Sequence, residues 1–110
     1  MKVYVDGSSD GKFCYFVDET GEGKVSRGKK LTNIQAEYKA IIMALRNIKG
    51  VKITIYSDNQ PIVGQLNHKW HIRDDDLRAL ALKVWKLIGK RKVSFRWVPR
   101  EKNKAGKILG

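Results

Sequence analysis

The chain has 110 residues, enough for one domain with a two- or three-layer core and too few for two domains. Its longest apolar run, Ala40–Leu45, is far too short to span a membrane. The 23 Lys and Arg residues against 11 Asp and Glu residues give a net charge of +12. This excess favours a polyanionic partner, nucleic acid ahead of a membrane surface, although a merely solvated surface would have the same composition.

Three short strands are predicted in the first part of the chain, joined by tight turns. Residues 2–6 alternate, with Val3 and Val5 on one face of the strand. Glycine-containing turns separate this strand from two further candidate strands, residues 12–18 and 24–29. Three strands joined in this way make an antiparallel meander.

The compartment is predicted from the N-terminus and from cysteine usage. A strand that begins at the second residue leaves no room for a signal peptide, so we expect a cytoplasmic (intracellular) protein. Cys14 is the one cysteine of the chain, so no internal disulfide can form, and its strand-like surroundings predict a small core residue. We expect a monomer that makes no membrane contact.

A helix and two parallel strands follow the meander. Thr32 and Gln35 match a capping box, apolar residues then recur at helical spacing up to Ile48, and Gly50 ends the helix. The remaining predicted elements are strand 51–58, short helix 60–66, loop 67–75, helix 77–88, strand 92–98 and helix 101–109. This order predicts an α/β fold over residues 1–110: a mixed five-stranded sheet, with strands 1–3 antiparallel and strands 1, 4 and 5 parallel, covered by helices.

Three carboxylates are predicted to meet at one edge of this sheet. Asp6 and Asp58 each end a predicted strand, and open α/β sheets bind ligands at the carboxyl ends of parallel strands. Glu37, placed in the first turn of the predicted helix, lies on the apolar stripe between Ile34 and Ile41 and should face the sheet. A buried carboxylate is costly unless it is paired or bound to a cation.

A divalent cation would relieve the repulsion among these three groups. Oxygen-only ligands select a hard ion, Mg²⁺ or Mn²⁺, over zinc. Two such ions about 4 Å apart could activate a water and stabilise the leaving oxygen in phosphodiester hydrolysis. Each carboxylate alone has a structural explanation, as a turn cap or a partner of the helix dipole. Their convergence in a basic chain favours the metal site.

Four short motifs, spread over almost the whole chain, carry a family resemblance. Each is weak alone, but their order, spacing and placement on strands and helices are specific. They are Val5-Asp6-Gly7-Ser8, Thr32-Asn33-x-x-Ala36-Glu37, Ser57-Asp58-x-Gln60 and Val98-Pro99-Arg100-Glu101-x-Asn103. Together they resemble type 1 ribonuclease H, which cleaves the RNA strand of RNA–DNA hybrids.

The resemblance implies that Asp6, Glu37 and Asp58 are catalytic residues and ligands of Mg²⁺ or Mn²⁺. It also implies that the chain contacts an RNA–DNA hybrid, with some residues near the 2′-hydroxyls of the RNA and Thr32 at a DNA phosphate. Trp70 lies in a loop rich in aromatic and basic residues that could line the DNA strand or could pack internally. The predicted nucleic-acid contacts are Ser8, Ser9, Thr32, Asn33, Gln60, Trp70 and Asn103.

Lys107 is the main departure from the family pattern. It stands where the resemblance places a fourth metal-binding aspartate. Asn103 and Lys107 are four residues apart in a predicted helix, so Lys107 should point at the site and weaken the second of two metal positions. Glu101 could form an ion pair with Lys107 and neutralise its charge.

Two other groups of residues have open interpretations. Trp85 and Trp97 lie in regular elements and are predicted to belong to the core. Lys86 and residues 90–92 form a basic corner that could bind phosphate or could simply be solvated.

The sequence therefore predicts an endoribonuclease that hydrolyses the RNA strand of RNA–DNA hybrids, with activity that Lys107 could impair. One alternative is a hybrid-binding module of the same fold with little or no catalysis. Another is a different nuclease of the superfamily, such as a resolvase, an integrase-like domain or the nuclease part of a polyprotein. The Thr32-Asn33 and Gln60 matches argue against that alternative.

Overall fold

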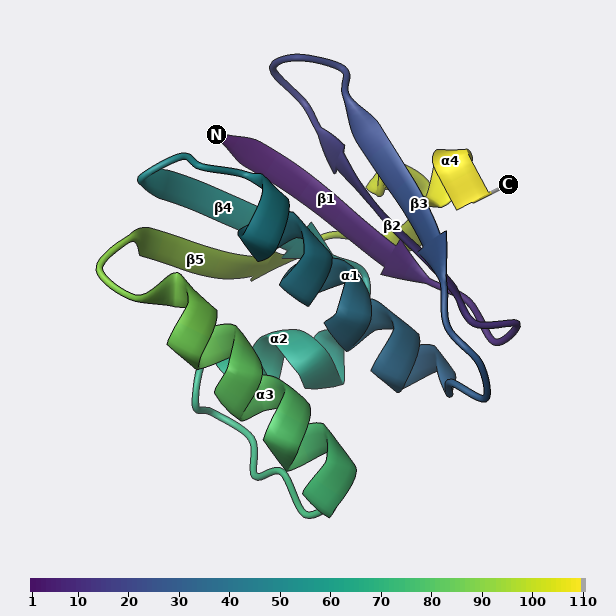
Figure 1. Cartoon of the computed structure of the whole chain (residues 1–110), viewed down its shortest axis with the longest axis vertical. Helices are drawn as coiled ribbons and strands as arrows, with labels where there is room; N and C mark the ends of the chain where they lie inside the picture. The colour runs from purple at the N-terminus through teal and green to yellow at the C-terminus, as the bar shows by residue number, and fades with distance from the viewer. Residues whose placement is uncertain (110) are drawn as a thin grey trace.

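A five-stranded mixed sheet, in the order β3-β2-β1-β4-β5, forms the centre of the computed structural model, which describes residues 1–109 (Figure 1). β1 pairs antiparallel with β2 and parallel with β4, which in turn pairs parallel with β5. The predicted fold class is confirmed. The strands are β1 Lys2–Gly7, β2 Lys12–Val17, β3 Gly23–Arg27, β4 Lys52–Ser57 and β5 Lys92–Trp97.

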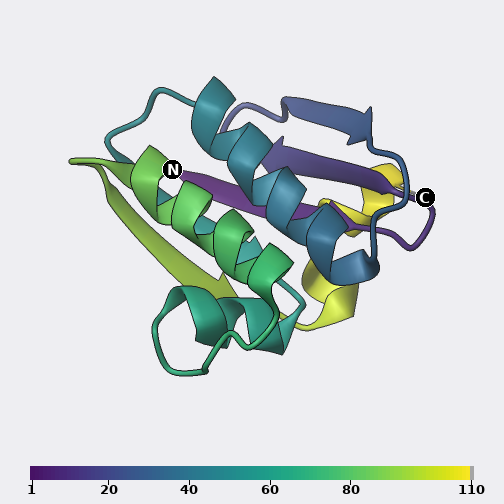
Figure 2. The same ribbon diagram turned by 60° about the horizontal axis from the view of Figure 1, so that its bottom comes forward.

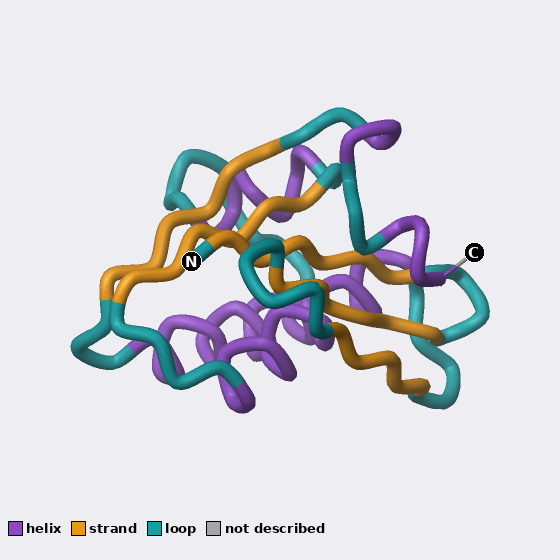
Figure 3. Tube along the Cα trace, turned by 90° about the horizontal axis from the view of Figure 1, so that it is seen from above, coloured by secondary structure: helices purple, strands orange, loops and turns teal. Residues whose placement is uncertain are grey.

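The two long helices cover one face of the sheet. In Figure 1 α1 and α3 lie in front of the strands, and in Figure 2 they run side by side. Seen from above, both lie on the same side of the strands (Figure 3). None of the helices over residues 1–109 combines the length and apolarity that a membrane span requires. The helices are α1 Asn33–Asn47, α2 Gln60–Leu66, α3 Asp75–Ile88 and α4 Gly106–Leu109, with a 3₁₀ turn η1 at Arg100–Lys102.

The core lies between the sheet and α1, as the alternation in the strands predicts. Val3, Val5, Ile53 and Ile55 are buried on the helix side of β1 and β4, and the intervening residues are partly or fully exposed on the other side. The predicted capping box at the start of α1 is present, and Cys14 is fully buried as expected.

The prediction of one helix over 101–109 is wrong, because Asn103 interrupts it. The Asn103 side-chain Nδ2 donates to the carbonyl of Val5 at 2.9 Å, and its Oδ1 accepts from the backbone N–H of Ala105 at 3.1 Å. These bonds fix Asn103 in an extended backbone conformation (φ −80°, ψ 105°). The segment therefore divides into η1 and α4.

Smaller corrections concern the ends of elements and one tryptophan. Asp6 precedes the last residue of β1, Asp58 follows β4, and Glu37 is the fifth residue of α1, outside its first turn. Trp97 is 46% exposed and so lies outside the core, because it ends the edge strand β5, where its indole donates to the Asp58 carbonyl at 3.1 Å. Trp85 is partly buried against the core.

Within the predicted basic corner, Arg91 has a structural role. Its guanidinium donates to the carbonyls of Leu45 and Ile48 at the end of α1, at 3.0 and 2.8 Å. It also donates to the carbonyls of Leu87 and Ile88 at the end of α3, at 2.7 and 3.4 Å. The last carbonyls of a helix have no intrahelical partner and carry partial negative charge, so one cation satisfies two helix ends.

We expect the substitution Arg91→Ala to lower the free energy of unfolding by about 2–3 kcal/mol, because hydrogen bonds to charged groups are stronger than neutral ones. The neighbouring exposed residue Lys90 is the control, and Lys90→Ala should change stability by less than about 0.5 kcal/mol. Urea denaturation followed by circular dichroism measures both. Equal stability of the two variants would contradict the structural role of Arg91.

Candidate metal centre and substrate cleft

The three candidate carboxylates come from the carboxyl ends of β1 and β4 and from the second turn of α1. The approach of α1 to β1 depends on Gly7: a Cβ there would lie 2.6 Å from the backbone nitrogen of Glu37, closer than real Cβ contacts allow. Glycine is therefore required at this position, and α1 lies directly against the end of β1. This contact brings Glu37 beside Asp6.

Asp6, Glu37 and Asp58 form a compact cluster. One carboxylate oxygen from each lies within 4.8 Å of the others. Glu37 is 4% exposed, and its Oε2 has no hydrogen-bond partner among residues 1–109. The Asp58 Oδ2 accepts from the Nδ2 of Asn103 at 3.1 Å, which fixes one side of the cluster. An unpartnered oxygen on a buried carboxylate that lies beside two other carboxylates is what a cation would satisfy.

The electrostatics of the cluster point the same way. Burial, followed by the nearby charges of Asp58 and Asp6, raises the pKa of Glu37 to about 9. Burial and the charge of Asp58 also raise the pKa of Asp6, although the Gly7 N–H and Arg100 oppose the shift. Without a cation, the site therefore favours a protonated Glu37 that can donate to Asp6.

The cluster fits a hard divalent ion. All three donors are carboxylate oxygens, which suits Mg²⁺ or Mn²⁺ rather than zinc. Among residues 1–109 this is the one group of three such side chains close enough to hold a metal. Two neutral groups complete its surroundings: Asn59, the N-cap residue of α2, and Asn103.

Two adjoining clefts open at this edge of the sheet. The inner one, about 240 Å³, contains the carboxylate cluster together with Asn33, Asn59 and Arg100. The outer one, about 760 Å³, continues past Asp6 to the β1–β2 turn and the C-terminal segment. Arg100 lines both clefts and was missed as a site residue by the sequence analysis, although it belongs to one of the four motifs.

The predicted nucleic-acid contacts divide into three groups. Ser8, Ser9 and Asn33 line the outer cleft. Thr32 and Gln60 are exposed near the site, at the starts of α1 and α2, but line neither cleft. Trp70, 50% exposed, lies beside His68 and Trp85 in a separate hollow of about 370 Å³. Their roles stay predictions.

Asn103 also lines the outer cleft, but it is 1% exposed. Its side chain makes three hydrogen bonds inside the protein, to Val5, Asp58 and Ala105. These bonds hold the C-terminal segment against β1 and orient the Asp58 carboxylate. Its predicted contact with nucleic acid stays a prediction.

The structure changes the interpretation of the C-terminal segment. Because η1 and α4 are separate, Asn103 and Lys107 do not lie on one face of a single helix. The prediction that Lys107 points at the carboxylates assumed such a shared face, so the structure does not support its basis. Lys107 is exposed and lines the outer cleft. The residue that approaches the cluster is Gly106, where a Cβ would lie 3.4 Å from the Asp6 Oδ2.

Known proteins resemble this chain in sequence and in fold. A family model described as Reverse transcriptase-like matches residues 14–109. The chain belongs to this family. Among curated relatives, the ribonuclease H of Caldicellulosiruptor saccharolyticus is 34% identical over 76 residues, covering 62% of this chain and 52% of that protein. The bifunctional protein Rv2228c of Mycobacterium tuberculosis is 27% identical over 86 residues, covering 74% of this chain and 23% of that protein. The chain thus spans about a quarter to a half of the length of these relatives.

Solved structures of ribonucleases H share the fold over almost the whole chain. RNase H1 from the archaeon Halobacterium salinarum NRC-1 superposes with a TM-score of 0.85 at 26% identity, covering 98% of this chain and 92% of that one. LC11-RNase H1 in complex with an RNA/DNA hybrid superposes with a TM-score of 0.83 at 21% identity, covering 99% of both chains. The predicted resemblance of this family member to ribonuclease H is confirmed.

The raised pKa of Glu37 predicts how the stability of the metal-free protein depends on pH. Between the ordinary value of 4.5 and about 9, the folded protein holds a proton on Glu37 that the unfolded chain releases. This contribution to stability is fully present below about pH 4.5 and is lost as the pH rises towards about 9. Over this range we expect the free energy of unfolding in EDTA to fall by at least about 1 kcal/mol.

Urea unfolding in EDTA at about pH 5, 7 and 9 measures this dependence. The variant Glu37→Gln keeps the shape of the side chain but cannot titrate, so its stability should change less over the same range. Parallel curves for the parent and Glu37→Gln would show that Glu37 does not carry the effect.

Proposed function

We propose that this chain is a metal-dependent endonuclease that hydrolyses the RNA strand of RNA–DNA hybrids. The observation that carries the proposal is the convergence in one cleft of Asp6, Asp58 and the buried Glu37, whose Oε2 has no hydrogen-bond partner. Membership of the family, a net charge of +12 and relatives named as ribonucleases H support it. We further propose that residues 1–110 form one domain that acts as a monomer.

In this proposal Asp6, Glu37 and Asp58 hold Mg²⁺ or Mn²⁺. When bound, the metal supplies electrostatic stabilisation of the phosphodiester charge and activation of water. Asn103 acts through Asp58, whose carboxylate it orients. Arg100, at the junction of the two clefts, is placed to bind a phosphate of the RNA strand.

The outer cleft is proposed to hold the RNA strand. Ser8, Ser9 and Asn33 supply hydroxyl and amide groups along its wall, which suit the 2′-hydroxyls that distinguish RNA from DNA. Lys12 on the same wall offers a cation for the backbone. Thr32, Gln60 and Trp70 are proposed to contact the hybrid outside the two clefts.

Lys107 favours a second candidate function, a hybrid-binding module with weak or no catalysis. It is a cation on the wall of the outer cleft, which it shares with Asp6, one of the three carboxylates. A nearby ammonium lowers the affinity of a site for divalent ions, and a second metal position would be the more sensitive one. Binding of the hybrid would gain from the same charge.

Cleavage of an end-labelled RNA–DNA hybrid in Mg²⁺ and in Mn²⁺ tests the proposal. We expect the hybrid to be cut and the matched all-DNA and all-RNA duplexes to be left intact. The variant Asp58→Asn, which removes one ligand charge and little volume, should lose roughly a hundredfold or more in rate, as is common when an ionic contact in a site is removed. Circular dichroism of the variant checks that the fold is kept.

Two further variants separate the enzyme from the binding module. Lys107→Asp and Gly106→Asp each add a carboxylate beside the cleft. A side chain at position 106 would point towards Asp6, since a Cβ there would lie 3.4 Å from the Asp6 Oδ2. If the parent does not cleave the hybrid and either variant does, the proposed active site is supported, and the lack of a fourth carboxylate is what limits cleavage by the parent. If all three bind the hybrid without cutting it in either metal, the binding module is the better account. Cleavage of the all-DNA duplex would instead favour a different nuclease of the superfamily.

A further inference from the structure

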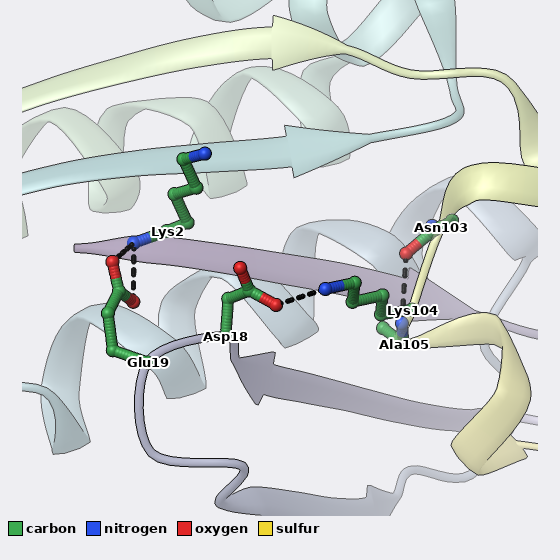
Figure 4. Close-up of polar contacts among 6 residues, drawn as sticks. All are labelled: Lys2, Asp18, Glu19, Asn103, Lys104 and Ala105. Carbon is green, nitrogen blue, oxygen red and sulfur yellow. Dashed lines mark hydrogen bonds and ion pairs between the residues drawn. The ribbon is translucent and has the colours of Figure 1, made fainter.

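The sheet has a second face that α1 and α3 leave uncovered. Figure 4 looks onto this face, with the helices behind the strands and the side chain of Lys2 standing on it. Along β4 and β5, alternate residues point here because the residues between them are packed against the core. Helix α4 packs against β1, β2 and β3, and at the β4–β5 end of this face Lys52, Lys92, Ser94 and Arg96 are exposed.

Two tyrosines lie side by side on this face. Tyr4 of β1 and Tyr56 of β4 are register partners, and their rings stack with centroids 5.0 Å apart at 22°. Lys104 lies over the Tyr4 ring, with its Nζ 5.7 Å from the centroid, and is itself paired with Asp18 (Figure 4). Lys104 therefore lies at the Tyr4 end of the stack. The face of Tyr56 that is turned away from Tyr4, its free face in the stack, lies on the β5 side, and Tyr56 is partly exposed.

Cations lie along β4 and β5 on the same face as Tyr56. Arg96 is the register partner of Tyr56, and Lys52 and Lys92 are register partners of each other nearer the start of the same strands. All three are exposed, and none forms an ion pair with another of the residues that the structure describes. Between the lysines and Arg96 lie the hydroxyl groups of Thr54 and Ser94, again register partners.

The charge on this surface changes sign only at its end. Strands β4 and β5 contain no acidic residue, and the first carboxylate after β4 is Asp58. From Lys52 to Asp58 the strand extends about 20 Å, the length of about six stacked nucleotides. The surface therefore runs from a pair of lysines, past an aromatic ring, to the carboxylate edge of the sheet.

We propose that this open face binds single-stranded nucleic acid, with a base stacked on the free face of Tyr56 and phosphates on Lys52, Lys92 and Arg96. A partly exposed aromatic ring such as Tyr56, beside cations on a sheet, is the combination that binds single strands, because every base has a π-face and every nucleotide a negative charge. The proposal does not depend on the chemistry proposed at the carboxylates. An unpaired extension of a hybrid held in the clefts is the strand that this face can reach.

A second basic surface supplies the comparison. A hollow of about 320 Å³ over α1 is bordered by Lys24, Lys39, Arg46 and Lys83, also without ion pairs among residues 1–109. With Lys2 counted, the open face also carries four cations, so the charge is equal. The apolar lining of the hollow is a buried Phe13 with aliphatic side chains, so no ring is available there for stacking. Charge alone predicts equal binding at the two surfaces, and stacking predicts binding at the open face.

Fluorescence anisotropy with labelled single-stranded oligonucleotides, one of DNA and one of RNA, tests the proposal on the full chain in EDTA. Under these conditions the carboxylates hold no divalent ion, so a failure here is separate from a failure to cleave hybrids. We expect Tyr56→Leu to weaken binding roughly five- to a hundredfold, the usual effect of losing one base–aromatic stack. Tyr56→Phe keeps the ring and should bind as the parent does.

Charge variants make the second comparison. The triple variant Lys52→Gln, Lys92→Gln and Arg96→Gln should lower the slope of log K against log salt by about 2, since each phosphate contact with a single strand contributes about 0.7. The matched triple variant Lys39→Gln, Arg46→Gln and Lys83→Gln removes the same charge from the other face and should leave the slope nearly unchanged.

Three results would overturn the proposal. One is equal affinity of the parent and Tyr56→Leu for both oligonucleotides. Another is an equal loss of slope in the two triple variants, which would mean that the whole basic surface binds the strand. The third is a parent that sedimentation shows to be a dimer and a Tyr56→Leu variant that is a monomer, which would make a second copy the occupant of this face.

Discussion

The burial of the Glu37 carboxylate against two aspartates is the constraint on which the site depends. Three acidic groups within 4.8 Å, one of them 4% exposed and with an unpartnered oxygen, are unfavourable by themselves. The fold maintains this arrangement by close packing: Gly7 lets α1 lie against β1, and the capping box fixes where α1 begins. A protein keeps such electrostatic strain at a site that a ligand completes.

The C-terminal segment holds the other side of the same cluster. Asn103 joins the end of β1 to Asp58 through the Val5 carbonyl and the Asp58 carboxylate, and this use of its side chain divides the last helix into two short pieces. As a result Gly106 faces Asp6 and Lys107 lines the outer cleft. The chemistry available at the site therefore depends on a segment that hydrogen-bonds to Asp58 through the Asn103 amide and places Arg100 in the same cleft.

The charge excess has several physical roles that composition cannot separate. Arg91 donates hydrogen bonds to the ends of α1 and α3, and Lys104 pairs with Asp18 and lies over the Tyr4 ring. Arg100 lies at the junction of the two clefts, while the cations on β4 and β5 surround a tyrosine stack. The net charge of +12 thus combines cations that cap helices, cations that pair within the protein and cations on two separate surfaces.

The sequence by itself determined the sheet and the three carboxylates, because these follow from local patterns. Alternation at Val3 and Val5, helical spacing after Thr32, and aspartates at strand ends each depend on a few neighbouring residues. The tertiary structure decided what depends on distant contacts: the break at Asn103, the hydrogen bonds of Arg91 to two helix ends and the exposure of Trp97. Each of these side chains bonds to at least one residue 39 to 98 positions away, and no local sequence period can predict such a contact.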